Sequence, residues 1–186
     1  MTELPAQPSW IEDVLAFWFE ELGERQWFAK DPGLDARIRA RFGALHAGLL
    51  ASEAGEVHGL RATQAAILVL DQFSRNLFRG DARAFAGDAI ARRLARDLVD
   101  AGLDAALPPA QRMFVYLPFE HSEDASDQAL SVRLTSAIGN DSWTTYAIAH
   151  QRIIERFGRF PHRNAALGRE SSAAELALLD EPMGSF

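Results

Sequence analysis

Hydrophobic residues recur along this chain at the spacing of amphipathic helices. Ile38, Phe42, Leu45 and Leu49 follow one another at intervals of three or four residues, which places them on one face of a helix. A similar apolar face runs through residues 143–157. No segment alternates apolar and polar residues with the period of two that a half-buried strand shows. The pattern therefore predicts an all-α protein.

Capping residues, glycines and prolines divide the chain into about eight predicted helices. Ser9 with Glu12, and Ser172 with Glu175, have the spacing of capping boxes, and Pro118 is predicted to end a helix near Leu117. Short connections favour antiparallel neighbours, so we expect a stack of helical hairpins. No linker interrupts the chain, which predicts a single domain over residues 1–186. The predicted helices cover residues 10–22, 32–50, 61–78, 82–101, 108–117, 124–137, 142–157 and 173–180.

Composition narrows the class of protein. Apolar residues make up 48% of the 186 residues and charged residues 24%, the balance of a soluble globular domain. The absence of cysteine excludes disulfides and thiolate chemistry. A formal charge of −7 argues against general nucleic-acid binding. The chain has no apolar stretch of membrane-spanning length and no leader-like start, so we expect no membrane contact and a cytoplasmic location.

The third predicted helix turns polar at its C-terminal end. Residues 67–70 are apolar on all sides, which indicates a buried helix. Asp71 and Arg75 follow at positions i and i+4. One interpretation is a structural ion pair that caps the helix end together with Arg79. The other is that Arg75, Asn76 and Arg79 point into a cavity.

A second polar stretch follows the predicted helix end at Leu117. Glu120, His121, Ser122 and Glu123 are expected in a tight loop. A histidine beside carboxylates is suited to act as a general base or a metal ligand, although a buried histidine satisfied by its neighbours has the same pattern. His121, Ser122 and Glu123 are adjacent and cannot form a catalytic triad among themselves. His150, in the apolar face of residues 142–157, is open to the same two interpretations.

The segment RFGRFPHRNAALGRES, residues 156–171, is basic in an acidic chain. Residues 150–169 hold five arginines and one glutamate, and such a loop needs carboxylate partners or a bound anion. It is therefore either a latch onto the loop around His121 or one wall of a pocket whose other walls are His121 and the Arg75–Arg79 helix end. The carboxylates available to a latch are Asp71, Asp88, Glu120, Glu123 and Asp124.

These stretches together resemble the bacterial proteins of domain-of-unknown-function family 924. The matching segments run from about residue 14 to 171 and read VLAFWF, WFAKDPGLDARIRARF, LDQFSRNLFRGDARAFAGD, FVYLPFEHSED and RFGRFPHRNAALGRES. The resemblance implies an all-α fold of paired helices, similar to tetratricopeptide-like superhelices although that repeat's spacing is absent. It implies no particular activity.

The leading functional hypothesis is a polar Arg/His pocket that binds an anionic small molecule or a peptide carboxylate. No catalytic residue and no metal ligand are assigned by this hypothesis. The residues expected to line the pocket are Arg75, Asn76, Arg79, Glu120, His121, Glu123, His150, Arg159, His162, Arg163, Asn164 and Arg169.

Two alternatives remain open at this point. One is a metal-assisted or acid–base hydrolase that uses His121, His150 and His162, although no HExxH motif is present. The other is a scaffold that binds a protein partner through its helices. The glycines form neither GxGxxG nor a phosphate-binding loop, so we expect no cofactor.

Overall fold

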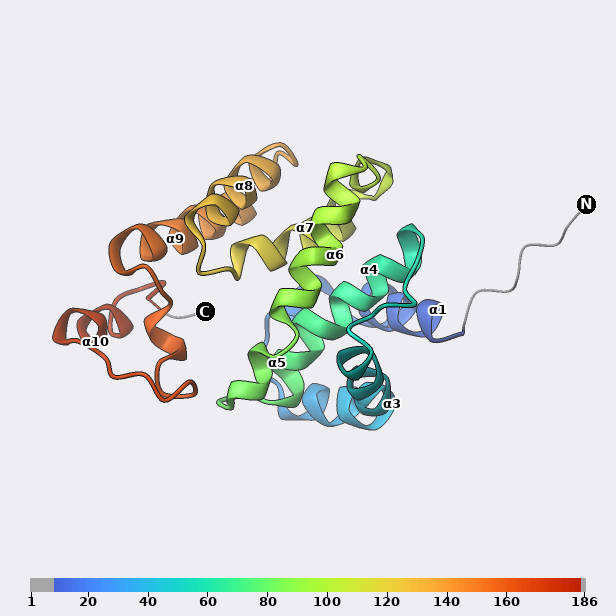
Figure 1. Cartoon of the computed structure of the whole chain (residues 1–186), viewed down its shortest axis with the longest axis horizontal. Coiled ribbons are helices and arrows are strands. Elements are labelled where there is room, and N and C mark those ends of the chain that lie inside the picture. Colours follow the sequence, from blue (N-terminus) through green and yellow to red (C-terminus); the bar gives the residue numbers. More distant parts are fainter. Residues whose placement is uncertain (1–8, 185–186) are drawn as a thin grey trace, which may run out of the picture.

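Helices supply the regular structure of residues 9–184, the part of the chain that the computed structural model describes (Figure 1). No strand is present in this range. Its α-helices are α1 (Ser9–Ala16), α2 (Glu24–Trp27), α3 (Pro32–Ala51), α4 (Leu60–Leu68), α5 (Ser74–Leu77), α6 (Asp88–Asp100), α7 (Pro109–Glu120), α8 (Ala125–Ser136), α9 (Asp141–Phe157) and α10 (Ala173–Leu179).

Five tighter or wider helical turns join these helices. Two are π-helical, η1 (Phe17–Glu21) and η2 (Val69–Phe73), and three are 3₁₀ turns, η3 (Ala82–Phe85), η4 (Asp104–Ala106) and η5 (Pro161–Arg163). Helices α6, α7 and α8 each contact the next helix along the chain, as expected for hairpins. The all-α prediction is confirmed. None of the helices between residues 9 and 184 is long and apolar enough to cross a bilayer.

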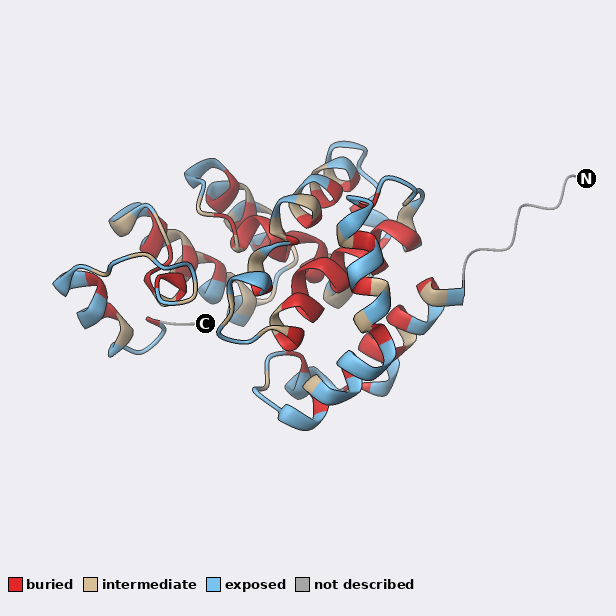
Figure 2. Ribbon diagram, turned by 60° about the horizontal axis from the view of Figure 1, so that its bottom comes forward, coloured by how far each residue is buried: buried red, intermediate tan, exposed pale blue. Residues whose placement is uncertain are grey.

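Two apolar cores of unequal size hold the described residues together. The larger one is rich in aromatic rings and collects buried side chains from α1 through α7, with Trp18, Phe73 and Phe114 completely buried. The smaller one consists of Ile153, Ile154, Phe160 and Leu178. Figure 2 shows buried residues on the inward faces of the helices, with exposed residues on the outer faces. The C-terminal segment therefore packs on its own small core.

The predicted helix over residues 61–78 is not a regular α-helix. It forms α4, then the π-helical turn η2, then α5. A π-helical turn contains one extra residue and often occurs at functional sites. Asp71 lies in this turn and is buried.

The prediction that Pro118 ends its helix is wrong. Helix α7 continues through Pro118 to Glu120. Proline removes one backbone hydrogen bond from a helix, but Phe119 and Glu120 are buried beyond it, and tertiary packing overrides the local cost. Glu120 is therefore a helical residue, and the loop begins at His121.

Two predicted helix starts also need correction. Asp81 caps the 3₁₀ turn η3 instead of a long helix, and α6 begins only after Gly87. A Cβ atom at Gly87 would lie 2.4 Å from the Leu70 carbonyl oxygen, so glycine is required for this close approach. The cap of α9 is Asn140, not Ser142, because the asparagine oxygen accepts from the Trp143 amide.

Candidate functional site

A buried aspartate–histidine pair links η2 to the residue that follows α7. His121 Nδ1 lies 2.7 Å from Asp71 Oδ1. Burial alone would raise the pKa of Asp71, but the charges of Arg75 and His121, with hydrogen bonds from His121 and Gln72, lower it. Burial and the Arg75 charge lower the pKa of His121. At neutral pH the pair is therefore an ionised aspartate and a neutral histidine that donates Nδ1–H to it.

Arg75 lies beside this pair and joins it to α6. Its NH1 is 3.0 Å from Asp71 Oδ1, the same oxygen that His121 contacts. The guanidinium also donates to both oxygens of Asp88, at 3.0 and 3.2 Å. Asp88 is placed here because Gly87 lets the first turn of α6 approach η2.

Arg163, from η5, brings a second guanidinium to Asp88. Its NH2 donates to the His121 carbonyl oxygen at 2.9 Å, while its NH1 lies 3.4 Å from Asp88 Oδ2. The guanidinium lies over the rings of Phe85 and Phe160, 4.7 and 4.6 Å from their centroids. Its buried Nε has no hydrogen-bond partner among the described residues. Burial and the Arg75 charge lower the pKa of Arg163 to about 10.

Glu120 and His150 form the inner side of the same group. His150 Nδ1 lies 3.1 Å from Glu120 Oε1 and 2.9 Å from the Tyr146 carbonyl oxygen. Burial, with repulsion from Asp71, raises the pKa of Glu120 to about 8. Burial lowers the pKa of His150 well below its usual value. Both side chains are therefore mainly neutral at pH 7.

The three predicted histidines approach one another. The rings of His121 and His150 have centroids 6.1 Å apart, and Phe160 packs on both His150 and His162. Burial and the Arg163 charge lower the pKa of His162 to about 3, so this ring is neutral too. We call the following set the central cluster: Asp71, Arg75, Asp88, Glu120, His121, His150, His162 and Arg163.

The other two arginines of the predicted pocket's C-terminal segment, Arg159 and Arg169, pair with protein carboxylates. Arg169 donates to both oxygens of Glu123, at 2.8 and 2.9 Å, and the Phe160 amide donates to Glu123 Oε1 at 2.7 Å. Arg169 also donates to Asn164 Oδ1. Arg159 pairs with Glu175, at 2.6 and 2.9 Å. These contacts tie the C-terminal segment to the loop after α7 and to its own last helix, as the latch interpretation predicts.

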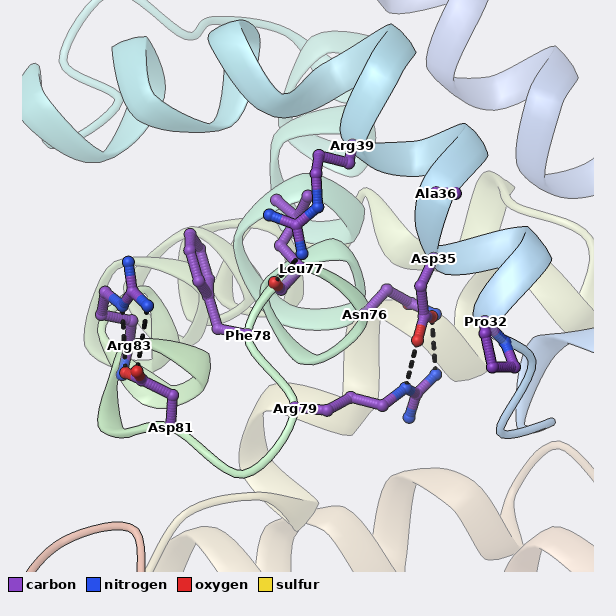
Figure 3. Close-up of a pocket in the computed structure, with 10 residues that line it drawn as sticks. All are labelled: Pro32, Asp35, Ala36, Arg39, Asn76, Leu77, Phe78, Arg79, Asp81 and Arg83. Atoms are coloured by element: carbon purple, nitrogen blue, oxygen red, sulfur yellow. Dashed lines mark hydrogen bonds and ion pairs between the residues drawn. The ribbon is translucent and has the colours of Figure 1, made fainter.

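Asn76 and Arg79 lie away from the central cluster, in a shallow pocket of about 390 Å³ (Figure 3). Arg79 donates to both oxygens of Asp35, at 2.6 and 2.9 Å, and Asn76 donates to Asp35 at 2.7 Å. Arg39 lines the same pocket and donates to the Leu77 carbonyl oxygen. The residues predicted to form one pocket wall, Arg75, Asn76 and Arg79, therefore lie in two places. Arg75 faces the histidines, whereas Asn76 and Arg79 contact Asp35.

Sequence reasoning missed several members of this arrangement. Asp71 and Asp88 were expected only as ion-pair partners, and Glu175 was not expected as the partner of Arg159. For Asp71, the spacing to Arg75 was the available signal. The contact between Asp88 and Arg163 spans 75 residues and has no local signal. Glu120 and Asp124 form no pair with an arginine among the described residues.

A metal site finds no support in this geometry. Within residues 9–184, no group of three or more His, Asp or Glu side chains is placed to hold a metal ion.

Comparison with known proteins places the chain in a family. The model of the family described as bacterial protein of unknown function (DUF924) matches residues 14–183. The chain belongs to this family. A solved structure of a protein of unknown function from Agrobacterium tumefaciens, ATU0120, is 38% identical to this DUF924 protein and superposes with a TM-score of 0.85. The match covers 92% of this chain and 97% of that chain. No curated protein matches the sequence.

Proposed function

We propose that this DUF924 protein binds a small organic carboxylate at the Arg75–Arg163 side of its central cluster. The observation that carries the proposal is the incomplete pairing of Arg163. This side chain is 8% exposed, yet its carboxylate contact is 3.4 Å long, is shared with Arg75, and leaves Nε without a partner among the described residues. A buried guanidinium so weakly neutralised is costly, and an oxyanion bound to it would recover that cost.

The other arginines of the C-terminal segment do not support such a site. Arg159 and Arg169 each hold a protein carboxylate with two hydrogen bonds, and so does Arg79 in its separate pocket. Their donors are already used in the geometry that suits a carboxylate. Arg75 also holds a carboxylate with two hydrogen bonds, so Arg163 is the guanidinium that lacks such a partner. The proposal therefore narrows the predicted Arg/His pocket to Arg163 and its neighbours Arg75 and His121.

The charge of the central cluster favours a singly charged ligand. Asp71 and Asp88 balance Arg75 and Arg163, while Glu120 and the histidines are mainly neutral at pH 7. A monoanion adds one negative charge, which Arg163 can balance once Asp88 is displaced from it and stays with Arg75. A doubly charged phosphate would leave a second charge unbalanced in a poorly solvated site.

The site has a partly exposed edge through which a ligand can approach. The side chains of Arg75 and His121 keep 21% and 14% of their surface exposed, whereas Arg163 lies deeper. We propose that the carboxylate contacts Arg75 at this edge and displaces Asp88 from Arg163.

Calorimetric titration of the full chain with benzoate tests the proposal. Wild type should bind benzoate and not the neutral benzamide. Arg163→Met keeps the apolar stem and removes the charge, so its affinity should fall about tenfold or more, the loss expected for a charge-assisted hydrogen bond. Arg163→Lys should give an intermediate affinity, since the charge remains and the planar fork is lost.

Arg79→Met is the matched control, because it makes the same change in the separate pocket of Figure 3. It should leave benzoate affinity unchanged. Equal affinity of wild type and Arg163→Met for benzoate, or a loss only in Arg79→Met, would contradict the proposed site. If wild type binds neither benzoate nor benzamide, the result favours the alternative prediction that the protein is a scaffold for a protein partner.

A further inference from the structure

We infer that the central cluster is also a catalytic site, in which His121 is the general base for hydrolysis of a small carboxylate-bearing ester and Asp71 positions it. The inference rests on the proposed function, because the substrate's carboxylate is taken to bind at Arg75 and Arg163. It goes further, because it assigns a reaction and a separate role to each member of the buried pair.

The His121 ring is oriented by its contact with Asp71. Nδ1 donates to the ionised Asp71 at 2.7 Å, which fixes the tautomer that carries the proton on Nδ1. The lone pair is then on Nε2, which has no hydrogen-bond partner among the described residues, and the side chain keeps 14% of its surface exposed. A neutral imidazole with one nitrogen held by a carboxylate and the other available is the arrangement of a general base.

The neighbouring Ser122 hydroxyl is engaged elsewhere. The Ser122 hydroxyl donates to Asp127 at 2.8 Å and accepts from Arg92. It is buried in that network and is held away from a role as the nucleophile for His121. The base therefore acts on water, which makes direct hydrolysis the reaction that the described residues favour.

Arg75 lies beside the His121–Asp71 pair. Its NH1 and His121 Nδ1 contact the same oxygen of Asp71, at 3.0 and 2.7 Å, so the guanidinium lies at the side of the base. This fixed positive charge on the Nδ1 side of the ring favours the neutral form of His121, which is the form that a general base needs. Arg163, which lies deeper and is held over two aromatic rings, is the anchor for the substrate's carboxylate.

The reaction proceeds in two steps, addition of water and collapse of the tetrahedral intermediate. His121 Nε2 takes a proton from water while the water oxygen forms a bond to the ester carbonyl carbon, and the carbonyl π electrons move to oxygen. The tetrahedral intermediate then re-forms the carbonyl, the bond to the leaving alkoxide breaks, and the proton on Nε2 passes to the alkoxide. The products are an acid and an alcohol, and His121 is again neutral.

The test uses 4-acetoxybenzoate, whose carboxylate is too distant to attack its own ester. Release of 4-hydroxybenzoate is followed by absorbance, and 4-acetoxybenzamide is the uncharged control substrate. Wild type should accelerate hydrolysis of the carboxylate substrate only. His121→Gln should lower kcat about 100-fold or more, the usual contribution of a general base.

The pH profile separates positioning by Asp71 from a purely structural role. In wild type, kcat/KM should rise with pH through the His121 pKa, which lies below its usual value, and should then level off. Asp71→Asn removes the negative charge that favours protonated His121, so the inflection should move to lower pH and the plateau should fall. The charged and titratable groups that face His121 are Asp71, Arg75, Asp88, His150, His162 and Arg163.

Benzoate titration separates this inference from the proposed function. His121→Gln should still bind benzoate while it fails to hydrolyse the ester. Benzoate binding without hydrolysis in wild type, or equal hydrolysis rates in wild type and His121→Gln, would overturn the catalytic inference and leave the binding site intact. Absence of benzoate binding would instead remove the proposed function on which the inference rests.

Discussion

Glu120 is a carboxyl group that its surroundings keep protonated in the native state, and this protonation can be tested directly. Its pKa is raised to about 8 by burial and by repulsion from Asp71, whereas in the unfolded chain it is near 4.3. Between these values the native state holds a proton that the unfolded state has released. The contribution of Glu120 to the free energy of unfolding therefore falls by about 1.4 kcal/mol for each unit of pH between these two values.

Glu120→Gln removes this titration while keeping the shape of the side chain. The free energy of unfolding of the variant, relative to wild type, should increase steadily between about pH 5 and pH 8. Urea unfolding at pH 5, 6.5 and 8 measures it. Glu12→Gln, at an exposed pair with Arg61, is the control and should show no such trend. A difference that does not change with pH would mean that Glu120 is ionised in the native state.

The sequence predicts burial and local ion pairs well, but it does not predict contacts between residues that are distant in the chain. Asp71 and Arg75 were recognisable as a pair because helical spacing places i and i+4 side by side. His150 was recognisable as buried from its position in an apolar face. By contrast, the contacts of Arg163 with Phe85 and Asp88 join segments that are distant in the sequence, and no local pattern encodes them.

At the scale of elements, Glu123 is the contact that holds the C-terminal segment to the loop after α7. It accepts two hydrogen bonds from Arg169 and one from the Phe160 amide. Glu123→Gln removes the charge and one acceptor, so the free energy of unfolding should fall by about 1–3 kcal/mol. Amide hydrogen exchange should accelerate in residues 159–169, whereas exchange in α4 and α7 should change little.

The control for this prediction is again Glu12→Gln. Glu12 also pairs with an arginine, but both side chains are exposed, and such pairs contribute about 0–1 kcal/mol. If the two variants lose the same small amount of stability and exchange in residues 159–169 is unchanged, the Glu123 contact is not a latch.

Some helix boundaries follow from neighbouring residues in the sequence, and others do not. Caps at Asp31, Asp124 and Ser172 formed where helix starts were expected, since capping depends on adjacent residues. The helix end at Pro118 and the helix start after Asp81 were wrongly predicted, because both depend on tertiary packing. Proline is tolerated where buried residues follow it, and Gly87 is required by the approach of α6 to η2.

At the scale of the whole molecule, the central cluster joins the two cores. Asp71, Asp88 and Glu120 come from the side of the large core, and His150 and Arg163 come from the C-terminal side that carries the small core. The all-α class and the association of the three polar stretches were predictable, because hydrophobic spacing and charge balance are properties of the sequence. The separation of Arg79 from the histidines was not, because it depends on how α3 presents Asp35.

A crystal structure of the full chain grown with benzoate would show directly whether Arg163 and Arg75 bind a carboxylate. The benzoate carboxylate should lie within hydrogen-bond distance of Arg163 and Arg75. Asp88 should be turned away from Arg163, and the contact of His121 with Asp71 should be unchanged. Benzoate bound beside Arg39 and Arg79 in the pocket of Figure 3, with the Arg163 contacts unaltered, would contradict the proposed site.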